Sequence, residues 1–115
     1  MRKKLVVGNW KMNGGLDANE TLLKALADAK DTLAGVEVAV CVPFPFLFQP
    51  AMLLESTPIA WGAQNVSEHA NGAFTGEVSA AMLKEFSCKY VLVGHSERRT
   101  LFGEDMYVAA KLLLA

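Results

Sequence analysis

The sequence lacks the features that mark membrane-bound, secreted and nucleic-acid-binding proteins. No apolar run approaches the roughly 20 residues of a membrane-spanning helix, and the apolar stretch after the basic start is too short for a signal peptide. The net charge of −1 gives no overall field that would attract nucleic acid or a membrane surface. We therefore expect neither nucleic acid nor a membrane among the partners of the chain.

Cysteine is scarce as well, since the chain contains only Cys41 and Cys88. Both stand in or beside apolar segments, and their spacing matches no metal-binding pattern. Isolated cysteines of this kind are typical of reduced thiols in the interior of intracellular proteins. The sequence thus predicts a cytoplasmic protein without a cysteine metal site.

What the sequence has in abundance is short, almost continuous apolar runs. The length of 115 residues leaves room for one small domain, and hydrophobic residues make up 52% of the positions. Apolar runs without polar alternation predict parallel strands that are covered on both faces. The predicted strands are residues 4–7, 37–42, 59–63 and 90–93.

Helical patterns separate these strands. Asp17 and Glu20 resemble a capping box, and apolar residues at helical spacing follow until Gly35, which is a stop signal. Three further helices are expected: the second follows Pro43-Phe44-Pro45 and runs through Leu54, the third is capped by Ser79, and the fourth starts near Glu104. Alternating strands and helices predict right-handed βα units around a parallel sheet.

A histidine stands at the end of the last predicted strand, in the segment Gly94-His95-Ser96-Glu97-Arg98-Arg99. Ser96 and Glu97 can start a helical turn, and a helix start presents free N–H groups and the positive end of the helix dipole. Both disfavour a protonated imidazole, so His95 is a candidate for a neutral functional histidine. Glu97 has cationic neighbours, which favours an electrostatic role over that of a general base.

An asparagine and a lysine follow the first predicted strand, in the segment Gly8-Asn9-Trp10-Lys11-Met12-Asn13. Loops after the carboxyl ends of parallel strands carry the chemistry of many enzymes. The segment fits neither G-x-x-x-x-G-K-[ST] nor G-x-G-x-x-G, the common phosphate-binding patterns. Asn9 and Lys11 are therefore candidates for a site shared with His95 rather than for a general nucleotide-binding loop.

A long polar loop from Gln64 to Glu77 precedes the third predicted helix, with turn signals at Asn71-Gly72 and Thr75-Gly76. A connection of more than about ten residues in a compact domain usually has a function or is disordered. The aromatic side chain of Phe74 at its tip favours a function, because it is expected to find a packing partner. A mobile surface loop is the alternative.

These motifs together resemble those of the triosephosphate isomerase family. Gly-Asn-Trp-Lys, Ala-Gln-Asn, Gly-Ala-Phe-Thr-Gly-Glu and Gly-His-Ser-Glu-Arg-Arg stand in the order of that family. The resemblance implies an isomerase of glycolysis and gluconeogenesis that interconverts dihydroxyacetone phosphate and D-glyceraldehyde 3-phosphate through an enediolate. It also implies a TIM (β/α)8 barrel, a homodimer in the cytoplasm, and chemistry without metal or organic cofactor.

The resemblance assigns roles to single residues. His95 and Lys11 would be catalytic, and Asn9 and Lys11 would bind the triose phosphate substrate. The family is itself the standard case of a neutral imidazole that polarises the substrate carbonyl. Ser96 and Glu97 would lie next to these groups and position them without contacting the substrate. The residues that would contact a second subunit are Phe74, Thr75, Glu77 and Arg98.

The resemblance also covers only the first half of the barrel. A complete (β/α)8 barrel takes about 250 residues, so four βα units in 115 residues make half of one. We expect residues 1–115 to form a single partial domain, a parallel (β/α)4 half-barrel that ends within the fourth helix. The glutamate base of the family follows the sixth strand, so the isolated half would be inactive without a carboxyl-terminal half-barrel. Its open strand edges would otherwise favour self-association.

Two other interpretations remain. The chain could be a non-enzymatic half-barrel module that associates with itself, or a flavodoxin-like domain that binds a nucleotide. The absent phosphate motifs and the missing stop signal in the last predicted helix count against the second.

Overall fold

The computed structural model of the chain describes residues 4–102. Its strands form one four-stranded parallel sheet, in which neighbouring strands are hydrogen-bonded in sequence order. The strands are β1 (Leu5–Asn9), β2 (Glu37–Val42), β3 (Ala60–Ala63) and β4 (Tyr90–Val91). Leu5 pairs with Glu37, Ala39 with Ala60, and Gly62 with Tyr90. The parallel sheet that the apolar runs predicted is confirmed.

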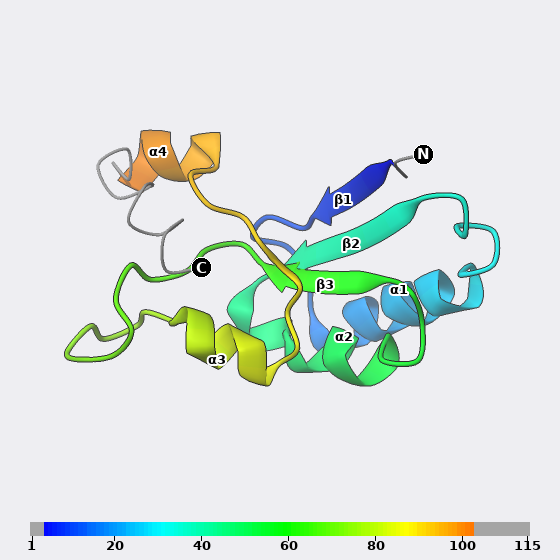
Figure 1. Cartoon of the computed structure of the whole chain (residues 1–115), viewed down its shortest axis with the longest axis horizontal. Coiled ribbons are helices and arrows are strands. Elements are labelled where there is room, and N and C mark those ends of the chain that lie inside the picture. Colours follow the sequence, from blue (N-terminus) through cyan, green and yellow to red (C-terminus); the bar gives the residue numbers. More distant parts are fainter. Residues whose placement is uncertain (1–3, 103–115) are drawn as a thin grey trace.

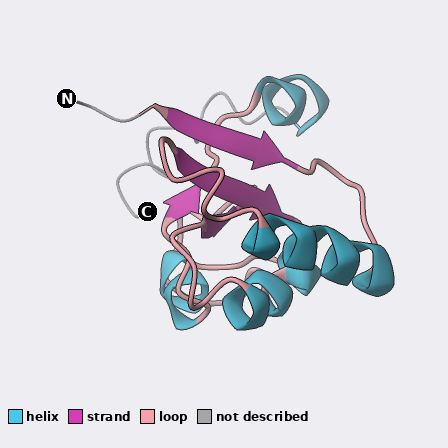
Figure 2. Ribbon diagram, turned by 90° about the vertical axis from the view of Figure 1, so that its right-hand side faces the viewer, coloured by secondary structure: helices cyan, strands magenta, loops and turns pink. Residues whose placement is uncertain are grey.

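The helices are α1 (Leu16–Asp28), the 3-10 turn η1 (Phe44–Phe46), α2 (Phe48–Leu53), α3 (Ala80–Glu85) and α4 (Ser96–Phe102). Figure 1 and Figure 2 show α1, α2 and α3 together on one face of the sheet, with α4 beyond the carboxyl ends of the strands. A doubly wound domain reverses its strand order and covers both faces of its sheet. The strand order found here therefore excludes the flavodoxin-like interpretation.

The hydrophobic core fills the space between the sheet and these three helices. Leu23 of α1, Val42 of β2 and Leu83 of α3 are almost completely buried. Each large aliphatic side chain removed from water contributes about 1.5–3 kcal/mol to folding. Gly62 lets β3 and β4 approach closely, because a Cβ at that position would stand 2.1 Å from the carbonyl oxygen of Tyr90.

The first helix differs from the prediction at both ends. It begins after Gly15 and not with a capping box at Asp17, because the side chain of Asn19 accepts the N–H of Gly15 at 3.2 Å. It ends at Asp28 rather than near Gly35, and turns follow. The last turn contains the acidic Asp28 and no basic residue. A negative charge beside the negative pole of the helix dipole is unfavourable, which favours an early end of the helix.

The second predicted helix is divided into η1 and α2. Pro50 lies in the first turn of α2, where a missing N–H costs no helical hydrogen bond. Ser79 caps α3 as predicted, since its Oγ accepts the N–H of Met82 at 3.2 Å. The fourth predicted helix near Glu104 lies outside the described residues, and α4 is the turn that begins at Ser96.

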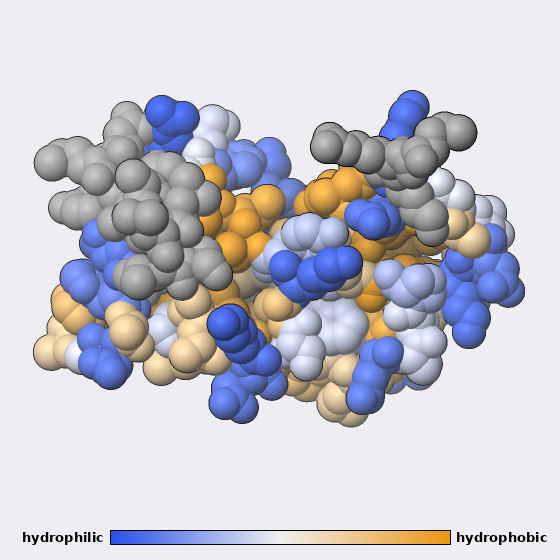
Figure 3. Space-filling view, viewed as in Figure 1, coloured by the Kyte–Doolittle hydropathy of each residue, from blue (hydrophilic) through white to orange (hydrophobic). Residues whose placement is uncertain are grey.

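Strand β1 is longer and more exposed than predicted. Its pairing with β2 continues through Gly8 and Asn9, so Asn9 belongs to the strand. The side chains of Leu5, Val6 and Val7 are 46%, 53% and 39% exposed. Figure 3 shows apolar residues gathered where Figure 1 places this strand. The expectation that the strands are covered on both faces is therefore wrong for β1, because its apolar side chains remain about half exposed among residues 4–102.

Among residues 4–102, no helix is both long enough and apolar enough to cross a membrane.

Candidate active site

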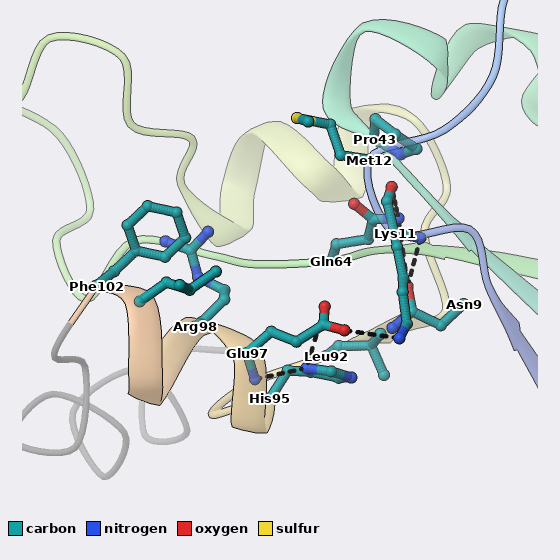
Figure 4. Close-up of a pocket in the computed structure, with 11 residues that line it drawn as sticks. Asn9, Lys11, Met12, Pro43, Gln64, Leu92, His95, Glu97, Arg98 and Phe102 are labelled. Atoms are coloured by element: carbon teal, nitrogen blue, oxygen red, sulfur yellow. Dashed lines mark hydrogen bonds and ion pairs between the residues drawn. The ribbon is translucent and has the colours of Figure 1, made fainter.

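The carboxyl ends of the strands border a cleft of about 400 Å³. Asn9 from β1 and Lys11 from the loop after it line one side, and His95 and Glu97 after β4 line another (Figure 4). Gln64, the first residue after β3, stands between them. The structure thus brings together four predicted site residues from the two ends of the described chain.

Lys11 has a constrained backbone. Its φ of 56° lies in the left-handed region, which costs a residue with a side chain about 1–3 kcal/mol and persists only where the surroundings fix it. Its N–H donates to Oδ1 of Asn9 at 2.9 Å, and its carbonyl accepts from Nε2 of Gln64 at 2.8 Å. Asn9 and Gln64 therefore hold the peptide groups on both sides of the Lys11 Cα.

Gln64 is a site residue that the sequence analysis missed. Besides the Lys11 carbonyl, its Nε2 lies 3.1 Å from the carbonyl oxygen of Cys41 and 3.4 Å from Oδ1 of Asn9. One amide group thus joins the ends of β1, β2 and β3. The sequence signal that could have identified Gln64 was its position directly after the predicted strand 59–63, which resembles the position of Asn9 just past the predicted strand 4–7.

The side chains of Lys11 and Glu97 form an ion pair across the cleft. Nζ of Lys11 donates to Oε1 of Glu97 at 2.6 Å, and the two side chains are 53% and 47% exposed. The hydrogen bond from Lys11, more than any other interaction, lowers the pKa of Glu97, while partial loss of solvent acts in the opposite direction. A base works best with a pKa near the working pH, so Glu97 is poorly suited to remove a proton from carbon.

The imidazole of His95 is oriented by the start of α4. Its Nδ1 accepts the N–H of Glu97 at 3.1 Å. Oε2 of Glu97 lies 3.8 Å from the same nitrogen, which is too far for a hydrogen bond, so the backbone contact sets the tautomer. With Nδ1 acting as an acceptor, the neutral ring carries its proton on Nε2. His95 is half-buried in the cleft and offers it an uncharged N–H donor.

The predicted subunit-contact residues fall into two places. Phe74, Thr75 and Glu77 lie in a loop that projects from the body of the molecule (Figure 1), and all three are exposed. Phe74 stacks on His69 of the same loop, with ring centroids 3.8 Å apart. Arg98 instead lines the cleft, and its guanidinium lies 4.8 Å from the centre of the Phe102 ring.

Within residues 4–102, no three His, Cys, Asp or Glu side chains gather closely enough to hold a metal ion. Cys41 is buried and Cys88 is half-buried, and both are free thiols. Burial raises the pKa of each to about 11. Both thiols therefore stay protonated at neutral pH, and neither is among the residues that line the cleft.

The strands of this parallel sheet pair in sequence order, and polar groups gather at their carboxyl ends. This arrangement is that of the βα-barrel proteins, whose sites lie at the carboxyl ends of the barrel strands. The family model of triosephosphate isomerase matches residues 4–115, and the chain belongs to this family. The triosephosphate isomerase of Thiobacillus denitrificans is 64% identical over 116 aligned positions, covering 100% of this chain and 46% of the relative. That of Dechloromonas aromatica is 59% identical, covering 96% of this chain and 45% of the relative.

A solved structure agrees with these relatives. The crystal structure of triosephosphate isomerase from Bartonella henselae matches with a TM-score of 0.88 and 36% sequence identity, over 99% of this chain and 46% of that chain. The fold is thus the half-barrel that the sequence predicted. The chain spans about half the length of the relatives that it matches.

Proposed function

We propose that residues 1–115 provide the electrophilic half of a triose-phosphate isomerase site, which interconverts dihydroxyacetone phosphate and D-glyceraldehyde 3-phosphate. One observation carries the proposal: the ammonium of Lys11 and the uncharged Nε2–H of His95 line the same cleft. A cation and a neutral donor side by side suit a substrate that bears both a phosphate dianion and a carbonyl group.

Lys11 binds the phosphate and stabilises the negative charge that develops on the enediolate oxygens. Its ion pair with Glu97 is about half exposed, and pairs of this kind contribute little. The ammonium can therefore turn from Glu97 toward substrate at small cost. Oδ1 of Asn9 is used by the Lys11 N–H, so Asn9 helps to position the substrate through its Nδ2.

His95 polarises the carbonyl through Nε2–H and passes its proton to the developing oxyanion. The same nitrogen then recovers a proton from the neighbouring hydroxyl, so the ring is unchanged after one turnover. Removal of the carbon-bound proton needs a carboxylate with a higher pKa than that of Glu97. We infer that this base comes from a later βα unit of the barrel.

We also propose that the chain forms one partial domain whose partner is the remainder of the barrel. The exposed apolar side chains of β1 support this, because a neighbouring strand would cover them. The projecting loop with Phe74, Thr75 and Glu77 is proposed to contact a second subunit, with Arg98 at the edge of that contact. The free thiols of Cys41 and Cys88 suit a cytoplasmic location.

The test joins residues 1–115 to the remaining half of the Thiobacillus denitrificans relative and assays the joined barrel with both triose phosphates. The intact relative is the control for assay and folding. We expect turnover in both directions without added metal or cofactor. A folded joined barrel with no turnover above the uncatalysed rate would contradict the proposal.

A further inference from the structure

A buried pair of side-chain amides links the starts of α1 and α2. Nδ2 of Asn19 donates to Oε1 of Gln49 at 3.0 Å, and the two residues are only 3% and 7% exposed. A buried amide is unfavourable unless its donor and acceptor groups are paired. The two amides satisfy each other only in part, so each needs a further partner.

These partners are backbone groups at the end of the Lys11 loop, which we define as residues 10–15, and at Leu16, the first residue of α1. Oδ1 of Asn19 accepts the N–H of Gly15 at 3.2 Å, and Nε2 of Gln49 donates to the carbonyl of Leu16 at 2.8 Å. A backbone donor at one end and a backbone acceptor at the other fix the orientation of both amides. The result is a continuous set of hydrogen bonds, which we call the amide relay.

Gly14 packs against the same relay. Its φ is 122°, and a Cβ at this position would stand 2.6 Å from Oδ1 of Asn19. The backbone of the Lys11 loop therefore lies directly on the Asn19 amide just before α1 begins. Asn19 holds this end of the loop both by a hydrogen bond and by close contact.

The other end of the loop carries Lys11 in its left-handed conformation. Gln64 and Asn9 fix the peptide groups around Lys11 itself. Only residues 12–14 separate Lys11 from the relay, and the side chain of Met12 is 94% exposed, so it packs on almost nothing. The relay is the buried anchor on the downstream side of this loop.

We propose that Asn19 and Gln49 are positioning residues for Lys11, and through it for the phosphate of the substrate. This proposal rests on the proposed function. Two apolar side chains could fill the same space and join α1 to α2 without any need for paired polar groups. The amides add a fixed position for the end of the loop, which apolar packing alone does not define.

The test uses the joined barrel with Asn19→Leu and with Gln49→Met, which keep the bulk of each side chain and remove its amide. Thr57→Val is the matched control, because Thr57 bonds to the backbone of Leu54 at 2.8 Å and of Ile59 at 3.2 Å, before β3. We expect kcat/KM to fall about tenfold to a hundredfold in the amide variants and to change less than about twofold in the control.

A double-mutant cycle with Lys11→Met separates positioning from general stability. If the amides act through Lys11, their removal lowers kcat/KM only while Lys11 is present. An equal fold-change in the Lys11→Met background would overturn the proposal, and so would an undiminished kcat/KM in the amide variants. If Asn19→Leu does not fold, Gln49→Met alone decides.

A second readout keeps this proposal distinct from the proposed function. In ¹⁵N–¹H spectra of the labelled joined barrel, the amide signal of Lys11 should shift in both amide variants and stay in place in Thr57→Val. A folded barrel without turnover would contradict the proposed function only. The Lys11 signal would then still decide the positioning role: a shifted signal supports it and an unmoved signal overturns it.

Discussion

Lys11 and Glu97 are bonded at 2.6 Å although they stand 86 positions apart in the sequence. Lys11 follows the first strand and Glu97 follows the fourth, so their ion pair joins the two outer strands of the sheet across the cleft. The backbone N–H of Glu97 also donates to Nδ1 of His95. One residue after β4 therefore faces the candidate cation through its side chain and orients the candidate imidazole through its backbone.

The pKa of Glu97 is expected to depend on Lys11. The hydrogen bond from Lys11 is the largest influence that lowers this pKa from its ordinary value of 4.5. Lys11→Met should therefore raise the pKa of Glu97, as measured by ¹³C NMR of the carboxyl group. Because the folded pKa is lowered, the stabilising effect of the pair is complete above the ordinary value and is lost as the pH falls through the lowered one. An unchanged titration would show that the pair does not form in solution.

Lys11→Met in the joined barrel should lower kcat/KM by about 10²–10³-fold. It removes a cation from the site where charge develops in the transition state, and one such contact contributes on the order of 3–4 kcal/mol. Lys24→Met is the matched control, since Lys24 is an exposed helix lysine paired with Glu20 at 2.9 Å. If kcat/KM of both variants stayed close to that of the unmodified barrel, Lys11 would be an ordinary surface lysine.

His95→Asn should lower kcat and leave KM almost unchanged. An amide keeps a donor near the substrate carbonyl, but it cannot give up a proton and recover it. Steady-state kinetics of the joined barrel separate the two constants. An effect confined to KM would assign His95 to binding alone.

Thr75→Arg should weaken association of the joined barrel with its second copy. Thr75 is exposed at a turn in the projecting loop, and an unpaired charge buried there in an interface meets a penalty of several kcal/mol. Sedimentation velocity at low micromolar concentration measures the effect, with Thr21→Arg on the exposed side of α1 as the control. Equal masses for both variants would favour a mobile surface loop that contacts no subunit.

Local signals predicted the parts of the fold that depend on neighbouring residues. The apolar runs gave the four strands and their parallel order, and Ser79 as a cap gave the start of α3. The helix start after His95 was also visible in the sequence, because Ser96 and Glu97 are adjacent to it.

The remaining features depend on contacts between distant residues. The capping box predicted at Asp17 is absent because Asn19, oriented by Gln49 of another helix, accepts the N–H of Gly15, the residue that precedes α1. Gln64 was missed because the atoms that it contacts belong to two other strands and the loop after β1. No pattern in the sequence places the backbone of Lys11 in the left-handed region, because that conformation results from these contacts.

Complementation between two separate polypeptides tests the central claim most directly. Residues 1–115 and the remaining half of the Thiobacillus denitrificans relative are purified apart, then assayed alone and as a mixture. We predict no isomerisation of triose phosphates by either part, turnover by the mixture, and loss of that turnover when residues 1–115 carry Lys11→Met. Turnover by the purified 115-residue chain alone would contradict the account, and so would an inactive mixture that forms a compact complex of the expected mass.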